Sequence, residues 1–321
     1  MHMHSEFSQV MPTAAVVPLV SLTDNFSYSE ADRRRNVIYR GDSLEFLKSL
    51  PEAPLFDLVV TSPPYNIGKA YEKRSALEVY LEWQESIIDE LVKRVKPGGS
   101  ICWQVGNFVD KGEIFPLDIE FAPMFRKRGM QLRNRIVWNF GHGLHNSRRF
   151  SGRYEVILWF TKSSEYVFNL DDVRIPSKYP GKRHYKGPKK GELSGNPRGK
   201  NPEDVWTIPN VKGNHVEKTD HPCQFPVGLV ERLVLALSNE DGLVFDPFAG
   251  VGSSGVAAAV HGRVFWGAEL DEGYAATAVR RVQDALAGKA VYRPHDRPVY
   301  DPQSSALSRT PVEWQRGTNE A

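Results

Sequence analysis

Residues 56–65 read Phe-Asp-Leu-Val-Val-Thr-Ser-Pro-Pro-Tyr, and they predict a buried strand that ends in a stiff loop. The first six residues are mostly apolar and β-branched, which is typical of a strand in a parallel sheet. The two prolines lack a backbone N–H and fix φ, so the loop is rigid and its carbonyl oxygens have no partner in the sheet. Because open α/β sheets bind ligands just beyond the carboxyl ends of such strands, this loop is a candidate binding site.

The loop residues Ser62, Pro63, Pro64 and Tyr65 suit a nucleobase that has left the helical stack. Free carbonyls and a hydroxyl can accept hydrogen bonds from an exocyclic amine, and the aromatic ring can stack on the base. A simple strand-ending turn is the alternative, since Pro-Pro and Ser-Pro commonly mark loops. A second motif decides between the two interpretations.

Residues 243–255 read Leu-Val-Phe-Asp-Pro-Phe-Ala-Gly-Val-Gly-Ser-Ser-Gly and predict a strand, a tight turn and the start of a helix. Gly250, Gly252 and Gly255 match the spacing G-x-G-x-x-G of nucleotide-binding turns, in which glycines let the backbone approach a ligand. Glu269 follows the next apolar run, at a position where a carboxylate accepts hydrogen bonds from ribose hydroxyls. No Lys-Ser or Lys-Thr follows the glycines, so the turn is not a phosphate-binding Walker loop.

The carboxylate of Asp246 stands at the tip of this strand. It suits a ligand with a cationic amine, whereas it would repel a pyrophosphate. A ligand with an adenosine, a ribose diol and an ammonium group is S-adenosylmethionine. With both motifs in place, the chain resembles the amino-methylating DNA methyltransferases, which modify adenine N6 or cytosine N4. That family pairs a catalytic (Asp/Asn/Ser)-Pro-Pro-(Tyr/Phe) with a cofactor loop Asp-Pro-Phe-x-Gly-x-Gly-(Ser/Thr), present here at 62–65 and 246–253.

The order of the motifs is similar to the family's β group, in which the catalytic motif comes first, the target-recognition segment second and the cofactor loop last. Two shorter matches agree: residues 39–44 contain a Gly-Asp-x-Leu element, and 221–226 resemble the element at the methionine end of the cofactor site. The resemblance spans residues 36–282. It implies contacts with S-adenosylmethionine from Asp42, Phe225, Asp246, Pro247, Phe248, Gly250, Gly252, Ser253 and Glu269.

The resemblance also implies a mechanism in which the target base leaves the duplex, since its amino group is paired inside the helix. Tyr65 then stacks on the base, while Ser62 and the Pro63 carbonyl accept hydrogen bonds from the amine, whose lone pair attacks the sulfonium methyl. Neither acceptor is a useful general base, so catalysis depends on positioning and electrostatics. Ser62 favours cytosine N4, whereas Asn66 is associated more with the adenine group, so adenine N6 stays an alternative.

The predicted fold class is α/β, a doubly wound, mostly parallel sheet of the S-adenosylmethionine-dependent methyltransferase type with an inserted target-recognition segment. Hydrophobic periodicity predicts helices at 77–95, 115–128 and 227–237, and strands at 100–105, 131–139 and 154–160. The expected organisation is an N-terminal arm (1–35), a catalytic methyltransferase domain (36–170 and 220–287), an inserted DNA target-recognition segment (171–219) and a C-terminal tail (288–321).

The charge of the chain is uneven along its length. The formal net charge is +2, but residues 174–218 hold eleven Lys or Arg against four Asp or Glu. That excess suits contacts with the phosphates of duplex DNA, and a solvated, partly disordered insertion is the alternative. The expected DNA-binding residues are Arg148, Arg149, Lys182, Arg183, Lys186, Lys189 and Lys190.

Residue counts bear on the other classes of site. The two cysteines, Cys102 and Cys223, are too few and too far apart for a metal or disulfide framework, and the histidines lack ligand spacing, so no metal is expected. Cys102 lies in an apolar run and is expected to be a buried small hydrophobe. Two cysteines without a disulfide framework suit a reducing compartment, so we expect a cytoplasmic protein. No apolar run reaches about eighteen residues, so no membrane span is expected.

Double-stranded DNA is the expected partner. A cognate restriction endonuclease and an orphan regulatory role are both compatible with the sequence, and homodimerisation stays open. Two other classes of protein are alternatives. A nucleotide-dependent oxidoreductase would leave residues 62–65 unexplained, and a non-catalytic DNA-binding module would show a broken motif. Within methyltransferases, an RNA or a protein glutamine is an alternative substrate, because enzymes that act on those substrates use an Asn-Pro-Pro-Tyr loop.

Overall fold

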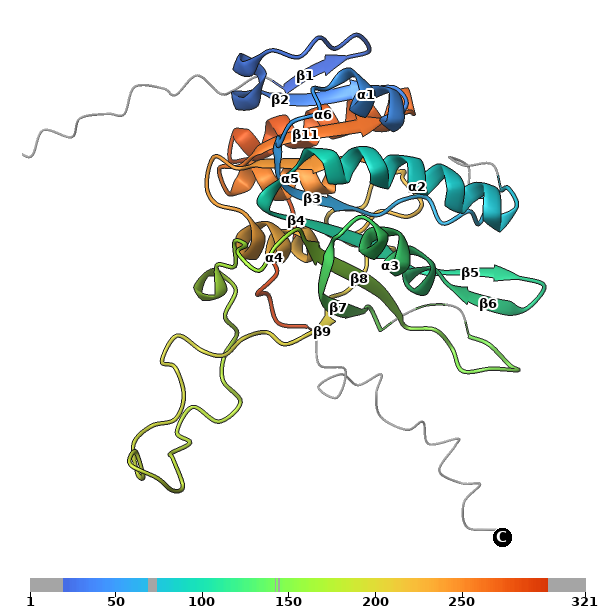
Figure 1. Cartoon of the computed structure of the whole chain (residues 1–321). Coiled ribbons are helices and arrows are strands. Elements are labelled where there is room, and N and C mark those ends of the chain that lie inside the picture. Colours follow the sequence, from blue (N-terminus) through green and yellow to red (C-terminus); the bar gives the residue numbers. More distant parts are fainter. Residues whose placement is uncertain (1–19, 69–73, 142, 144, 300–321) are drawn as a thin grey trace, which may run out of the picture.

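A computed structural model describes residues 20–68, 74–141, 143 and 145–299 of the chain. Within these residues, nine strands form one sheet in the order β1-β2-β11-β10-β3-β4-β8-β7-β9 (Figure 1). Neighbouring strands are parallel except where β8 pairs with β4 and with β7. The strands are β1 (Val20–Thr23), β2 (Asn36–Arg40), β3 (Phe56–Thr61), β4 (Val95–Val105), β7 (Gln131–Asn139), β8 (Tyr154–Thr161), β9 (Val205–Thr207), β10 (Leu243–Asp246) and β11 (Val264–Glu269). The predicted doubly wound, mostly parallel α/β sheet is confirmed.

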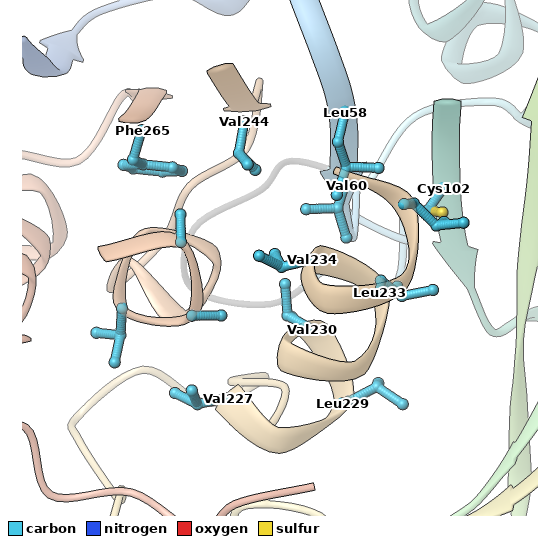
Figure 2. Packing of buried hydrophobic residues seen from close by; sticks show 14 of the residues in the cluster. Leu58, Val60, Cys102, Val227, Leu229, Val230, Leu233, Val234, Val244 and Phe265 are labelled. Carbon is cyan, nitrogen blue, oxygen red and sulfur yellow. The ribbon is translucent and has the colours of Figure 1, made fainter. Parts of the chain in front are cut away.

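In the part of the chain that the structure describes, three α-helices cover each face of the sheet (Figure 1). The helices are α1 (Ser43–Ser49), α2 (Leu77–Arg94), α3 (Leu117–Lys127), α4 (Val227–Leu237), α5 (Ser253–Val260) and α6 (Glu272–Leu286). The first three pack on one core cluster and the last three on the other. Because side chains alternate along a strand, β3 contributes residues to both clusters. Leu58 and Val60 lie on the α4 side of the sheet and Val59 on the α2 side. Figure 2 shows Val230 and Val234 of α4 in the cluster that includes Val60.

Most predicted elements are confirmed at or near their predicted bounds, including the strands at 56–61 and 131–139 and the helix at 227–237. The helix expected at 115–128 is shorter, because β6 (Glu113–Pro116) pairs with β5 (Asn107–Asp110) as a small hairpin before α3 begins. Cys102 is fully buried, as expected. No helix in the described ranges is long and apolar enough to cross a membrane.

The two ends of the described chain pack against the catalytic core, although the sequence suggested an arm and a tail. Strand β1 pairs with β2 in parallel at one edge of the sheet. Near the other end, the buried carboxylate of Glu231 on α4 accepts hydrogen bonds from the Tyr292 hydroxyl at 3.0 Å and the His295 backbone N–H at 2.6 Å. Residues 1–19 and 300–321 of the predicted arm and tail lie outside the described residues.

The insertion divides into an excursion and a return to the sheet. A 3-10 helix, Leu170–Asp172, precedes a long irregular excursion that reaches away from the sheet (Figure 1) and is closed by the bridge between Ile175 and Lys200. The chain then returns as β9, which pairs with β7, and Trp206 of β9 is buried in the core. Part of the segment predicted for target recognition therefore completes the sheet.

Candidate active site

The loops after four neighbouring parallel strands, β2, β11, β10 and β3, line a cavity of about 690 Å³ at the carboxyl edge of the sheet. This is the edge at which ligands bind in open α/β sheets. Eleven of the thirteen predicted catalytic and cofactor residues line it, namely Asp42, Ser62, Pro63, Pro64, Tyr65, Phe225, Pro247, Phe248, Gly250, Ser253 and Glu269. Asp246 and Gly252 are buried and are not among the lining residues.

Asp246 holds the cofactor loop from behind. It is fully buried, and its carboxylate accepts hydrogen bonds from the Thr61 hydroxyl at 2.5 Å, from the Phe248 backbone N–H at 3.0 Å and from the Ser254 hydroxyl. Burial raises the pKa of this carboxyl to about 6. The sequence motif predicted that Asp246 faces a cationic amine, but the structure places it among hydrogen-bond donors of the chain itself. Its geometry is that of a residue that orients the loop.

Gly252 completes the turn for a steric reason. Its φ is +76°, in the left-handed region that side chains rarely adopt, and it precedes the first residue of α5. A Cβ at this position would lie 2.9 Å from the Cβ of Ala278 on α6. The glycine therefore allows α5 and α6 to pack closely while the turn faces the cavity.

The carboxylates of Glu269 and Asp42 are fixed by backbone donors. Glu269 accepts from the N–H of Gly250 and from the N–H of Asp271, both at 2.8 Å, and burial raises the pKa of its carboxyl. Asp42 accepts from the first N–H groups of α1. Each carboxylate oxygen has a further lone pair, so Glu269 can still accept from a ribose hydroxyl in the cavity.

The cofactor end of the cavity also contains the imidazole of His221 and the rings of Tyr274 and Trp83. These three were not among the predicted site residues. Burial, with a contribution from Lys218, lowers the pKa of His221 to about 4, so the imidazole is neutral at physiological pH. Its ring packs edge-on against Tyr274 at 4.6 Å between centroids. Trp83 of α2 packs edge-on against Phe248 at 5.6 Å. A neutral imidazole beside the glycine turn does not repel a sulfonium, and the aromatic rings suit an adenine. These residues fit S-adenosylmethionine.

The catalytic loop is tied to two neighbouring strands through the Tyr65 hydroxyl. This oxygen lies 3.1 Å from the Ser62 hydroxyl, 2.9 Å from Oε1 of Gln104 on β4 and 3.2 Å from Oε2 of Glu155 on β8. Nε2 of Gln104 donates to the same Glu155 oxygen at 2.5 Å. Burial raises the pKa of the Tyr65 phenol well above its ordinary value, so the phenol keeps its proton.

Gln104 and Glu155 both line the cavity, and neither was predicted from the sequence. Each interrupts an apolar strand, and that interruption was the available signal, because a buried polar side chain in a strand needs a partner. Burial raises the pKa of the Glu155 carboxyl, although Lys212, another cavity residue, favours its charged form.

Asn66 has a structural role directly after the catalytic tyrosine. Its φ is +58°, and it is buried. Its side chain accepts a hydrogen bond from the Ser75 backbone N–H at 2.7 Å and donates one to the Ser75 carbonyl at 2.9 Å. Asn is among the few residues that adopt this backbone conformation readily. The presence of Asn here is therefore explained by the loop, whichever base is methylated.

The predicted DNA-binding residues fall into two separate, exposed groups. Lys182, Arg183, Lys186, Lys189 and Lys190 lie on the excursion, and Arg148 and Arg149 lie on the loop between β7 and β8. This second loop lies beside the β5–β6 hairpin, on the opposite side of the view from the excursion (Figure 1), and Arg149 donates to the Gly112 carbonyl of the hairpin turn. The structure thus places basic groups on two sides of the molecule.

Comparison with known proteins gives consistent matches. The N6/N4 methyltransferase family model, described as DNA methylase, matches residues 56–280. The Type II methyltransferase M.BglII of Bacillus subtilis is 52% identical over 240 residues, 74% of this chain and 66% of that relative. The DNA adenine methyltransferase YhdJ of Escherichia coli (strain K12) is 31% identical over 254 residues, 77% of this chain and 83% of that relative. The solved structure of a DNA modification methylase from Thermus thermophilus, complexed with S-adenosyl-L-methionine, matches with a TM-score of 0.56 and 28% identity, covering 79% of this chain and 97% of that chain.

Proposed function

Because the chain belongs to the N6/N4 amino-methylating DNA methyltransferase family, with S-adenosylmethionine as its cofactor, we propose that it methylates cytosine N4 in duplex DNA as the modification enzyme of a restriction system. This family membership argues against the alternative that the protein is an oxidoreductase. The likeness to the Type II methyltransferase M.BglII supports the restriction role, with a cognate endonuclease as partner.

The choice of base rests on Ser62, because the structure gives Asn66 a role that does not depend on the base. Ser62 at the first position of the catalytic motif favours cytosine N4. Asn66 was the sequence argument for adenine, and its positive φ and its two hydrogen bonds to Ser75 account for it without reference to the base. Adenine N6 is the second candidate, because the adenine methyltransferase YhdJ is 31% identical.

The mechanism follows from how the chain holds its two ligands. When bound, S-adenosylmethionine supplies an electrophilic methyl group. Glu269 and the rings of Trp83 and Phe248 would hold its adenosine, and the neutral His221 lies near the glycine turn. Tyr65 stacks on the flipped base, and the Ser62 oxygen accepts a hydrogen bond from the exocyclic amine. This bond orients the nitrogen lone pair toward the methyl group, and the nitrogen loses one proton to solvent after the transfer, because the Ser62 hydroxyl is not a useful base. The chain thus contributes positioning and electrostatic stabilisation.

The test is transfer of labelled methyl groups from S-adenosylmethionine to unmethylated plasmid DNA, followed by mass spectrometry of the digested nucleosides. We expect N4-methylcytosine. N6-methyladenine would overturn the choice of base and establish the second candidate. No transfer to DNA, with cofactor binding shown by calorimetry, would overturn DNA as the substrate and direct the search to RNA or protein.

The restriction role needs its own experiment. Plasmid methylated by this enzyme is challenged with the product of any endonuclease gene that neighbours its own gene. We expect cleavage of unmethylated plasmid and protection of the methylated plasmid. Equal cleavage of both plasmids would contradict the proposed partnership.

A further inference from the structure

We infer that Glu155 is a positioning residue that sets the direction of the hydrogen bonds running from Ser62 to Tyr65, and thereby makes the Ser62 oxygen an acceptor for the target amine. The inference rests on the proposed function, since it concerns the amine that this site methylates. It applies to cytosine N4 and adenine N6 alike, because both are exocyclic amines.

The phenol of Tyr65 has one proton and three oxygen neighbours. Gln104 Oε1 lies at 2.9 Å, Ser62 Oγ at 3.1 Å and Glu155 Oε2 at 3.2 Å. An amide oxygen and an ionised carboxylate can only accept, so the phenol proton goes to one of these two. The remaining contact, between Ser62 and Tyr65, then has only the serine hydroxyl as its donor.

Glu155 also decides which end of the Gln104 amide faces the phenol. Its Oε2 accepts from Nε2 of Gln104 at 2.5 Å, which turns Oε1 of the same amide toward Tyr65. Without the carboxylate, the amide could rotate and present its NH₂ group to the phenol instead. The Glu155 carboxylate is thus itself an acceptor for the phenol proton, and it also makes Gln104 an acceptor.

The direction of these bonds matters for the chemistry at Ser62. With its proton committed to Tyr65, the hydroxyl turns its lone pairs to the cavity, where an N–H of the target amine can donate to them. A hydroxyl with the opposite orientation would donate to the amine nitrogen and occupy the lone pair that has to attack the methyl group. The direction of the bond therefore decides whether the Ser62 hydroxyl assists or blocks attack by the amine nitrogen.

The direction of these bonds depends on the charge state of Glu155. Burial raises the pKa of its carboxyl, and the titratable groups that act on it are the Tyr65 phenol, from the loop after β3, and Lys212, from the loop after β9. Protonation would give the carboxyl a hydrogen to donate, and the chain of bonds could then run in reverse. Turnover should accordingly fall as the pH drops through the raised pKa of Glu155.

The test compares Glu155→Gln, Tyr65→Phe, Ser62→Ala and the double variant Ser62→Ala/Glu155→Gln. Each of the first two should lower kcat roughly 10–100-fold, the range for loss of a hydrogen bond to a charged or catalytic group. The KM for DNA and the Kd for S-adenosylmethionine, measured by calorimetry, should stay within about twofold of wild type. The acid limb of the kcat profile should disappear in Glu155→Gln. The double variant should be no slower than Ser62→Ala, because Glu155 acts through the serine.

Glu231→Gln is the matched control, since it neutralises a buried carboxylate outside the cavity. It should leave the kcat profile unchanged. Multiplied losses in the double variant, or an unchanged acid limb in Glu155→Gln, would overturn the inference while leaving the proposed function intact. If Glu155→Gln does not fold, Tyr65→Phe combined with Ser62→Ala gives the same cycle. A wild-type enzyme that transfers no methyl group to DNA would overturn both proposals.

Discussion

The hydroxyl of Thr61 donates a hydrogen bond to the carboxylate of Asp246 at 2.5 Å, although the two residues are 185 positions apart in the chain. Thr61 ends β3 and immediately precedes the catalytic loop, whereas Asp246 ends β10 and is the first residue of the cofactor loop. Both residues are fully buried. This bond links the two halves of the active site, so the position of the target amine and that of the cofactor loop depend on one another.

Thr61→Val should therefore weaken cofactor binding as well as the fold. Valine has the same shape but no hydroxyl, so the buried carboxylate loses one donor at a cost of about 1–3 kcal/mol in the free energy of unfolding. Denaturant unfolding and calorimetry with S-adenosylmethionine measure the two effects. Thr161→Val removes a hydroxyl that is equally buried, at the end of β8, and serves as the control. The prediction fails if both variants bind the cofactor as wild type does.

Ser62→Ala separates binding from turnover. The Ser62 oxygen lines the cavity and is the proposed acceptor for the target amine. Its described side-chain hydrogen bond goes to Tyr65 and not to the cofactor loop, so the Kd for S-adenosylmethionine should not change. Loss of an acceptor for the amine should lower kcat roughly 10–100-fold. Single-turnover methylation gives the rate, and fluorescence of a 2-aminopurine at the target position reports whether the base still leaves the stack. Parallel losses of cofactor affinity and turnover would contradict the assignment of Ser62 to the base.

The sequence predicted those parts of the site that follow strand ends. Residues 62–65 and 246–253 each follow a short apolar run, and parallel strands bring their carboxyl ends to one edge of the sheet, so two distant motifs could be placed together. Gln104 and Glu155 could not be placed in the same way. They lie inside strands, and their encounter depends on the antiparallel pairing of β4 with β8, in which Gln104 faces Ile157 rather than Glu155.

The orientation of the Asp246 carboxylate could not be predicted from the sequence either, for a related reason. The motif places a carboxylate at the strand tip, but whether it faces the ligand or the protein depends on donors from Thr61 and Ser254, on other elements. Strand β1 and the segment around Tyr292 escaped prediction because they are short and aperiodic. Their positions come from long-range pairing with β2 and from the Glu231 carboxylate.

Asp246→Asn should flatten the pH dependence of stability between about pH 4 and pH 6. The pKa of Asp246 is raised from 3.8 to about 6 by burial, so the folded state binds more protons than the unfolded state in this interval. The free energy of unfolding therefore falls as the pH rises through it, by up to about 3 kcal/mol for this group. An asparagine does not ionise, and its NH₂ group can donate to the Ser254 hydroxyl.

Denaturant titrations at several pH values measure this slope. Wild type should lose stability between pH 4 and pH 6 relative to the variant. Burial also raises the pKa of Glu155 and Glu269, so a residual slope of the same sign should remain in Asp246→Asn. Parallel stability curves for wild type and variant would show that Asp246 has the same pKa in the folded and unfolded states.

Neutralising the excursion should reduce the salt dependence of DNA binding. Lys182, Arg183 and Lys186 are exposed, and each phosphate contact contributes about 0.9 to the slope of log K against log salt concentration. Replacing all three with alanine should lower the slope by up to about 3 and weaken binding to every sequence alike, because phosphate contacts carry no sequence information. The control replaces Lys48, Arg280 and Lys289, which are also exposed and change the net charge equally. Fluorescence anisotropy of a labelled duplex at increasing salt gives both slopes. Equal slopes for the two triple variants would mean that the excursion acts only through net charge, and the predicted phosphate contacts would then have to lie elsewhere, with Arg148 and Arg149 as the next candidates.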